Sequence, residues 1–289
     1  MKWEDQRESS NVEDRRGEDS GGGFGIGGRH IGIGAIVIAL AGWGIFGINP
    51  LTTLGLLSGG STPHVQQGPA KAPPAGDRNA AFVSTILAST EDVWTQVFQQ
   101  GGARYAAPKL VLYRGSTPTA CGTGQAAMGP FYCPGDRKVY LDMDFFDTLT
   151  RQLGAPGEFA RAYVVAHEVG HHVQSLLGIT AKVDGMRGRV SEAQQNALSV
   201  RLELQADCYA GIWANRSQQA KRWLDPGDIH SAINAAQQIG DDTLQKRSQG
   251  YAVPDSFTHG SSAQRVRWFT QGYQSGSVQA CDTFNARNL

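Results

Sequence analysis

Apolar residues recur at helical spacing in two long stretches of the second half of the chain. In residues 158–178, apolar side chains return every three or four positions until Gly178 interrupts the pattern. A second stripe runs through residues 192–214 and follows Ser191, a residue type that favours the N-cap position. The pattern therefore predicts two amphipathic helices at these positions.

Two shorter segments alternate with the period of a half-buried strand. Residues 109–115 form the first. Residues 137–149 form the second, where Val139, Leu141 and Met143 alternate with tyrosine and aspartate side chains. Because the second segment shortly precedes the first long helix, it is either a strand to which an extended peptide adds or an internal strand without a ligand role.

The front of the chain has the pattern of a membrane anchor. Residues 1–23 are dense in charges of both signs and predict a disordered tail, whereas Ile31 to Ile48 contains no ionisable side chain. We therefore expect a transmembrane helix over residues 24–48 and a flexible glycine- and proline-rich linker over residues 49–78. Residues 79–289 then form the folded domain.

The cations on the two sides of this apolar stretch predict its orientation. Arg15, Arg16 and Arg29 precede it, and the first cation after it is Lys71. The positive-inside rule then places the N-terminus in the cytoplasm and residues 79–289 outside, in the periplasm or at the cell exterior. A cleavable signal peptide is the alternative, but the leader is long and acidic, which favours an uncleaved anchor.

Charge and cysteine usage narrow the partners and the compartment. Lys plus Arg and Asp plus Glu both total 26, so the formal net charge is zero and nothing favours a nucleic-acid partner. The four cysteines contain no C-x-x-C pair. We predict the disulfides Cys121–Cys133 and Cys208–Cys281, as in an exported protein, with four reduced, buried thiols as the alternative.

The helix over residues 158–178 contains the chain's clearest chemical signal. His167 and His171 are one helical turn apart on one face, so both imidazoles reach a single tetrahedral ion. Glu168 lies about 100° around the helix and is placed to hold a water beside that ion. This is the His-Glu-x-x-His pattern of zinc peptidases. His172 points away from this face, so we assign it no role at the metal.

A catalytic zinc site needs a third protein ligand. In the helix over residues 192–214, Glu203 and Asp207 are one turn apart beside the apolar stripe. We predict that Glu203 ligates the metal and that Asp207 accepts the free ring N–H of a ligating histidine, His167. A solvated acidic edge is the alternative for this pair. Glu192 is a weaker ligand candidate because an acid in the first turn already suits the helix dipole.

Four segments together resemble the bacterial neutral zinc metallopeptidase family: AHEVGHHVQSLLGI, SVRLELQADCYAGIWA, GPFYCPGDRKVYLD and FTHGSSAQRVRWF. The likeness extends over roughly residues 20–289. It implies that His167, His171 and Glu203 hold one Zn²⁺ ion, that Glu168 is the catalytic acid and base, and that one N-terminal span anchors the chain. The implied fold is an α+β, zincin-like domain with a small sheet packed on the motif helix.

The last of these segments offers a further candidate. His259 or Arg265 is placed to donate a hydrogen bond to the oxyanion of a tetrahedral intermediate. The alternative is structural: His259 and Ser261 cap a helix while Arg265 pairs with an acid.

These patterns predict a membrane-anchored zinc metallopeptidase that hydrolyses peptide or protein substrates with a water activated by Glu168. One alternative is a tethered, non-catalytic assembly factor whose zinc site is structural or degenerate. The intact Glu168 argues against it, because a closed structural site has no use for an acid there. A zinc amidase acting on a non-protein amide is the other alternative, and it shares every catalytic residue.

Overall fold

The computed structural model describes residues 1–18, 71–125 and 129–289. The chain divides into a compact unit formed by Met1–Gly17 together with Ala70–Leu289, and a second unit, Glu18–Pro69. The compact unit is a mixed α+β structure with a small sheet and several helices. All site residues lie in this unit.

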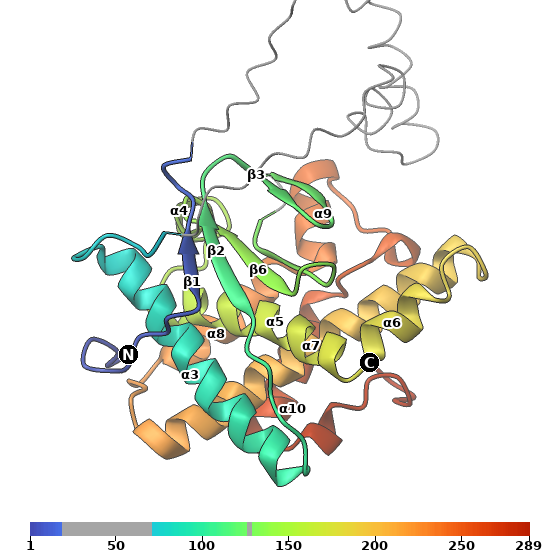
Figure 1. Ribbon diagram of the computed structural model, residues 1–289. Coiled ribbons are helices and arrows are strands. Elements are labelled where there is room, and N and C mark those ends of the chain that lie inside the picture. The colour runs from blue at the N-terminus through green and yellow to red at the C-terminus, as the bar shows by residue number, and fades with distance from the viewer. Residues whose placement is uncertain (19–70, 126–128) are drawn as a thin grey trace, which may run out of the picture. The chain divides into compact units, whose positions relative to one another are not determined.

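The sheet has four strands in the order β1-β2-β6-β5, in which β1 (blue) lies beside β2 at one edge (Figure 1). β1, β2 and β6 are parallel, whereas β5 is antiparallel to β6. A separate antiparallel hairpin is formed by β3 and β4. The bounds are β1 Val12–Asp14, β2 Lys109–Tyr113, β3 Ser116–Thr119, β4 Gly122–Gln125, β5 Phe131–Cys133 and β6 Lys138–Asp142.

Helices form the rest of the compact unit. The bounds of the α-helices are α3 Arg78–Gln100, α4 Phe145–Arg151, α5 Glu158–Leu176, α6 Ile179–Asp184, α7 Glu192–Lys221, α8 Asp228–Gln238, α9 Asp241–Gln249 and α10 Ser262–Ser275. Two short 3₁₀ helices are η2 Pro254–Ser256 and η3 Val278–Cys281. α5 packs against α7, α8, α3 and the sheet, so the motif helix is central.

The core around α5 explains why its sequence is apolar on more than one face. Phe159 stacks on Trp213 of α7 with ring centroids 5.6 Å apart, and both side chains are fully buried. On the far side of α7, a Cβ added to Gly272 of α10 would lie 1.9 Å from the carbonyl oxygen of Cys208. The α7 and α10 backbones therefore pack closely enough to require glycine there.

The two predicted helices are present, and each predicted strand is present in part. β2 ends at Tyr113 and β6 at Asp142, whereas residues 145–149 of the second predicted strand belong to α4. α5 ends at Leu176, and α7 continues to Lys221, beyond the predicted end. β6 pairs with β2 on one side and β5 on the other, so the alternative in which a peptide adds to it is wrong. β6 is the internal strand of the alternative interpretation, and β5 is the edge strand on that side of the sheet.

Both predicted disulfides are confirmed. Cys121 is bonded to Cys133, and Cys208 is bonded to Cys281, with S–S distances of 2.05 and 2.00 Å. The first joins the end of the β3–β4 connection to β5. The second joins α7 to η3 near the C-terminus.

The predicted disordered tail over residues 1–23 is wrong for residues 1–17. Val12 and its neighbours form β1, and Trp3 is buried. The charged side chains of this segment pair with opposite charges in the rest of the unit, for example Arg16 with Asp77 and Glu13 with Lys138. The predicted span over residues 24–48 and most of the linker lie outside the described residues. Among the helices that the structure describes, none has the length and apolar character needed to cross a membrane.

Candidate metal centre

Two helices bring the candidate metal ligands together. His167 and His171 lie one turn apart on α5, and Glu203 lies on the facing turn of α7. Gly170 is at the contact between the helices, where an added Cβ would lie 3.0 Å from the carbonyl oxygen of Ala206. The missing side chain lets the α7 backbone approach the histidines closely.

The donor atoms of the three residues lie close enough to share one ion, with the two histidines facing different oxygens of the Glu203 carboxylate. Nε2 of His167 lies 3.2 Å from Nε2 of His171 and 3.2 Å from Oε2 of Glu203, and Nε2 of His171 lies 3.3 Å from Oε1 of Glu203. Donors about 2.0 to 2.1 Å from a common centre at the tetrahedral angle are about 3.3 Å apart. His₂Glu is a ligand set that catalytic zinc uses. The residues present therefore fit a Zn²⁺ ion.

Hydrogen bonds orient both imidazoles toward this point. Nδ1 of His167 donates to Oδ1 of Asp207 over 2.8 Å, the partner predicted from the sequence. Nδ1 of His171 donates to Oε1 of Gln174 over 2.9 Å, because the amide of Gln174 donates to the carbonyl oxygen of Leu202. Both rings then carry the proton on Nδ1 and present an Nε2 lone pair to the metal.

Asp207 is itself held by a buried cluster that the sequence did not reveal. Its Oδ1 also accepts from the hydroxyl of Tyr163 (2.5 Å) and from Nη2 of Arg265 (3.0 Å), while Oδ2 accepts from Nε of Arg265 (2.9 Å). Tyr163, Asp207 and Arg265 are all buried. Arg265 therefore pairs with an acid, as in the structural alternative, and is not the oxyanion donor.

The charges of the centre favour a bound cation. Burial alone would raise the pKa of Glu203 and Asp207, but the histidines and, for Asp207, the Arg265 guanidinium lower the pKa of both carboxyls. Burial opposes protonation of His167, yet Asp207 and Glu203 raise its pKa to about 10. Metal and protons therefore compete for the same imidazole.

Glu168 has the environment of a general base. It is 7% exposed, and burial raises its pKa, although nearby positive charge on His171 and His167 opposes the shift. A carboxyl whose pKa is moved upward, toward neutrality, takes up and returns a proton more readily at neutral pH.

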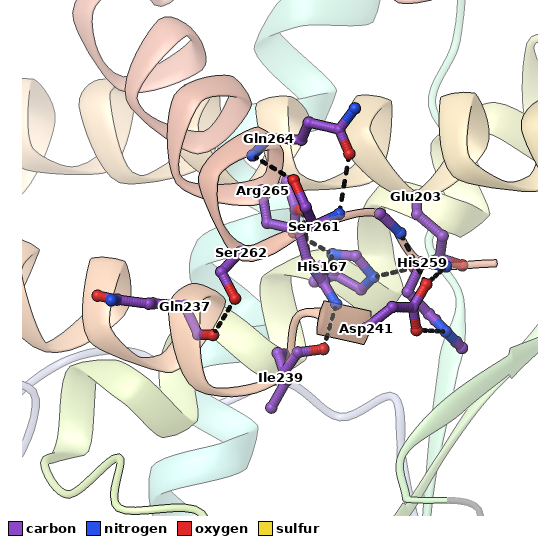
Figure 2. Close-up of polar contacts among 12 residues, drawn as sticks. His167, Glu203, Gln237, Ile239, Asp241, His259, Ser261, Ser262, Gln264 and Arg265 are labelled. Carbon is purple, nitrogen blue, oxygen red and sulfur yellow. Dashed lines mark hydrogen bonds and ion pairs between the residues drawn. The ribbon is translucent and has the colours of Figure 1, made fainter. Parts of the chain in front are cut away.

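His259 lies in the loop between α9 and α10. Its Nδ1 is 3.2 Å from Oδ1 of Asp241 (Figure 2). Oδ2 of Asp241 accepts from the backbone N–H groups of Thr258, His259 and Gly260. The Asp241 hydrogen bond raises the pKa of His259 against the smaller effect of its partial burial. The side chain remains 53% exposed, so the ring is fixed at one end and open to solvent.

Ser261 caps α10, as the structural alternative proposed. Its hydroxyl accepts from the backbone N–H of Gln264, whose side chain accepts from the Ser261 N–H (Figure 2). His259 makes no contribution to this capping box. The capping box therefore fixes the end of the loop at Ser261, and the His259 imidazole is not used in capping the helix.

His172 and Glu192 lie outside the donor cluster. Nε2 of His172 donates to the carbonyl oxygen of Ala106 over 2.6 Å, and Nδ1 lies 3.1 Å from the hydroxyl of Tyr132 on β5. Burial lowers the pKa of His172 to about 4. Glu192 is exposed in the first turn of α7. Through its contact with Tyr132, His172 connects α5 to the edge strand β5.

A family model described as "Putative neutral zinc metallopeptidase" matches residues 1–284. The chain belongs to this family. The match includes residues 1–17, which also belong to the compact unit. Family membership and the donor cluster point independently to zinc.

Curated relatives extend over most of the chain. It is 50% identical over 290 residues to the uncharacterized protein YpfJ of Escherichia coli strain K12, covering 98% of this chain and 99% of the relative. It is 43% identical over 220 residues to the uncharacterized protein Rv2575 of Mycobacterium tuberculosis strain H37Rv, covering 72% and 73%. No solved structure matches.

Proposed function

We propose that the protein is a zinc-dependent metallopeptidase in which His167, His171 and Glu203 hold one Zn²⁺ ion. The close approach of their donor atoms, 3.2 to 3.3 Å between each pair of residues, is the observation that carries the proposal. A structural zinc site is closed by four protein ligands. In the described part of the chain, the cluster contains three ligand residues and a buried glutamate beside them. This composition favours a catalytic site over a structural one.

The residues of the chain divide the work of amide hydrolysis. When bound, Zn²⁺ supplies Lewis acidity to the scissile carbonyl and to water. Glu168 takes the proton of the attacking water and later delivers it to the leaving nitrogen. His259, oriented by Asp241, donates a hydrogen bond to the developing oxyanion. Asp207 and Gln174 keep the two imidazoles in their ligating tautomer.

The substrate of this proposal is an extended peptide that pairs with the edge strand β5. An edge strand offers unpaired backbone groups, and β5 is joined to the motif helix through Tyr132 and His172. An antiparallel edge beside α5 would present a backbone carbonyl to the metal.

We propose that the catalytic unit lies outside the cytoplasm and that the apolar segment of residues 24–48 attaches it to that face of the membrane. Two disulfides and no free cysteine support an oxidising compartment. The sequence supports the anchor through the run from Ile31 to Ile48.

Substitution of Glu168 tests the catalytic role. Glu168→Gln should retain one zinc per chain and lose turnover by about 10²- to 10⁴-fold, because only the proton acceptor is removed. Zinc is measured by elemental analysis, and turnover by mass spectrometry of a digested peptide library. The full-length protein is used, because a fragment of residues 79–289 would lack β1.

Two further variants give this test its controls. Glu192→Gln changes an exposed glutamate at the start of α7 and should leave zinc content and turnover unchanged. Glu203→Ala should lose zinc. Peptidase activity retained by Glu168→Gln, or by protein treated with a chelator, would refute the proposal.

A further inference from the structure

The first seventeen residues of the chain are an integral part of the unit that carries the metal centre. β1 pairs in register with β2, with Val12 opposite Leu110 and Asp14 opposite Leu112. The N–H of Leu110 donates to the carbonyl oxygen of Asn11, and that of Arg15 donates to the carbonyl oxygen of Leu112, each over 2.8 Å. These are sheet hydrogen bonds, which require direct contact between the two segments.

Side chains before β1 extend this contact along α3. The backbone N–H of Ser9 donates to the carbonyl oxygen of Ser84 over 3.0 Å. The hydroxyl of Ser9 and the amide of Asn11 both donate to Oε1 of Glu91, over 2.5 and 2.8 Å. Arg7 pairs with Asp92 over 2.6 Å. A polar network therefore holds residues 7–11 to one helix of the compact unit.

Apolar packing adds to the polar contacts. Trp3 is 4% exposed, its ring meets that of Phe82 edge-on at 5.2 Å, and the Arg78 guanidinium lies 5.1 Å from its centroid. Val12 is 7% exposed. Burying a tryptophan and a valine is favourable in proportion to the apolar area removed from water, so the segment is bound by the same forces as the core.

Arg15 and Arg16, two of the arginines that predict a cytoplasmic N-terminus, form ion pairs within the compact unit. Arg16 pairs with Asp14 and with Asp77, each over 2.6 Å, and Arg15 pairs with Glu13 over 2.9 Å. Asp77 is also the N-cap of α3. Cations that belong to a folded unit are a weak orientation signal for a neighbouring apolar segment, because folded domains translocate largely regardless of their charge.

The backbone at Lys71, which follows residues 18–69, lies next to the end of β1. The N–H of Asp14 donates to the carbonyl oxygen of Lys71 over 2.7 Å, so the strand before residues 18–69 touches the backbone that follows them. A single membrane crossing between residues 17 and 70 would put these two hydrogen-bonded residues on opposite sides. The pairing and the predicted single-span orientation exclude each other.

We infer that residues 1–17 lie in the same compartment as the metal centre, outside the cytoplasm, and complete its sheet after reaching that side. The two disulfides in the same unit indicate which side this is. The inference rests on β1 and its contacts alone. It holds or fails independently of the proposed peptidase activity.

Cysteine labelling of the full-length chain in Gram-negative cells tests the sidedness. Glu8→Cys and, as the matched reference, Ala181→Cys on α6 are both at exposed positions, and the native cysteines are all in disulfides. A maleimide that does not cross the inner membrane should label both variants to the same extent before permeabilisation. Labelling of Ala181→Cys in intact cells together with labelling of Glu8→Cys only after permeabilisation would overturn the inference.

A second comparison tests the packing itself, in permeabilised cells where sidedness no longer matters. Val12→Cys places the thiol in buried β1 and should react at least about tenfold more slowly than Glu8→Cys, because labelling then requires local opening. Denaturant should abolish the difference. Equal rates for the two variants without denaturant would show that the segment is not part of the folded unit, and would also overturn the inference.

Discussion

Asp207 lies between the metal ligand His167 and the buried cation of Arg265 and contacts both. Its two oxygens accept from His167, Tyr163 and Arg265. Burial alone would raise the pKa of Asp207, but the adjacent Arg265 guanidinium stabilises the charged carboxylate and lowers its pKa. The carboxylate then remains an acceptor for the His167 N–H and fixes the tautomer that metal binding needs.

Removal of the guanidinium should therefore affect stability strongly. Arg265→Met leaves Asp207 as a buried charge without its cation, and we expect a loss of about 3 to 5 kcal/mol in the free energy of unfolding. Urea denaturation at pH 7 measures it. Arg267→Met, which changes an exposed arginine on the same helix, should cost less than about 0.5 kcal/mol. Equal losses in the two variants would contradict a role for the buried pair.

His172 should make the fold sensitive to acid. Burial lowers the pKa of the folded-state imidazole to about 4, whereas the unfolded imidazole titrates near 6.5. As the pH falls from about 6.5 to about 4, protons bind the unfolded state first, so stability falls by up to about 3 kcal/mol. Above about pH 6.5 both states are neutral and this effect is absent.

The measurement is urea unfolding at several pH values in the presence of a chelator, which removes the contribution of bound metal. His172→Gln should show a shallower loss of stability between pH 6.5 and 4 than the unsubstituted protein. His230→Gln removes an exposed histidine and should leave the slope unchanged. The assignment fails if His172→Gln and the unsubstituted protein lose stability in parallel.

The sequence predicted those site residues that lie within one turn of a single helix, because their spacing in the chain fixes their spacing in space. His167, Glu168 and His171 follow from a single turn of α5. Gln174 is also one turn from His171, but an uncharged residue in a helix carries no metal signal by itself. Arg265 is far from Asp207 in the chain, and only the packing of α10 on α7 shows that it is a partner rather than an oxyanion donor.

At the scale of elements, the distance between α5 and α7 sets the metal geometry. Gly170→Ala would place a Cβ 3.0 Å from a backbone oxygen of α7, so the helices must separate by some tenths of an ångström. We expect a loss of about 1 to 3 kcal/mol from overpacking, which exceeds the gain in helix propensity of up to about 1 kcal/mol. Zinc affinity should fall as Glu203 moves away from the histidines.

Competition with a chromogenic chelator measures the affinity, and urea unfolding measures the stability. Gly185→Ala is the control, because this glycine ends α6 with φ −63° and its nearest neighbours belong to its own turn. It should change neither quantity appreciably. A Gly170→Ala variant that binds zinc with unchanged affinity would show that the close approach is dispensable.

The periodicity of the sequence predicted where helices and strands lie, but not which strands pair with one another. α5, α7, β2 and β6 follow from their patterns, yet no pattern within β6 indicates that strands flank it on both sides. β1 was missed because three residues, two of them acidic, are too few to show an alternation. Its place in the sheet depends on partners in β2, which are far away in the sequence.

At the scale of the whole molecule, the two disulfides close loops of different length. Cys121 and Cys133 are 12 positions apart in the sequence, and Cys208 and Cys281 are 73 positions apart. The chain-entropy model gives a stabilisation of about 3 kcal/mol for the short loop and about 4 kcal/mol for the long one. The long loop contains α10, with Arg265, and begins on α7, which carries Glu203.

Removal of each disulfide as a pair of serines should therefore separate stability from metal binding. Cys208→Ser with Cys281→Ser should lower the urea midpoint more than Cys121→Ser with Cys133→Ser, and should also weaken zinc binding, because Cys208 lies beside Asp207 and one turn and a half from Glu203. The hairpin variant should keep the zinc affinity of the unsubstituted protein, since β3 and β4 contribute no ligand. If both double variants bind zinc equally well, the covalent link between α7 and η3 supports the fold but does not position the metal centre.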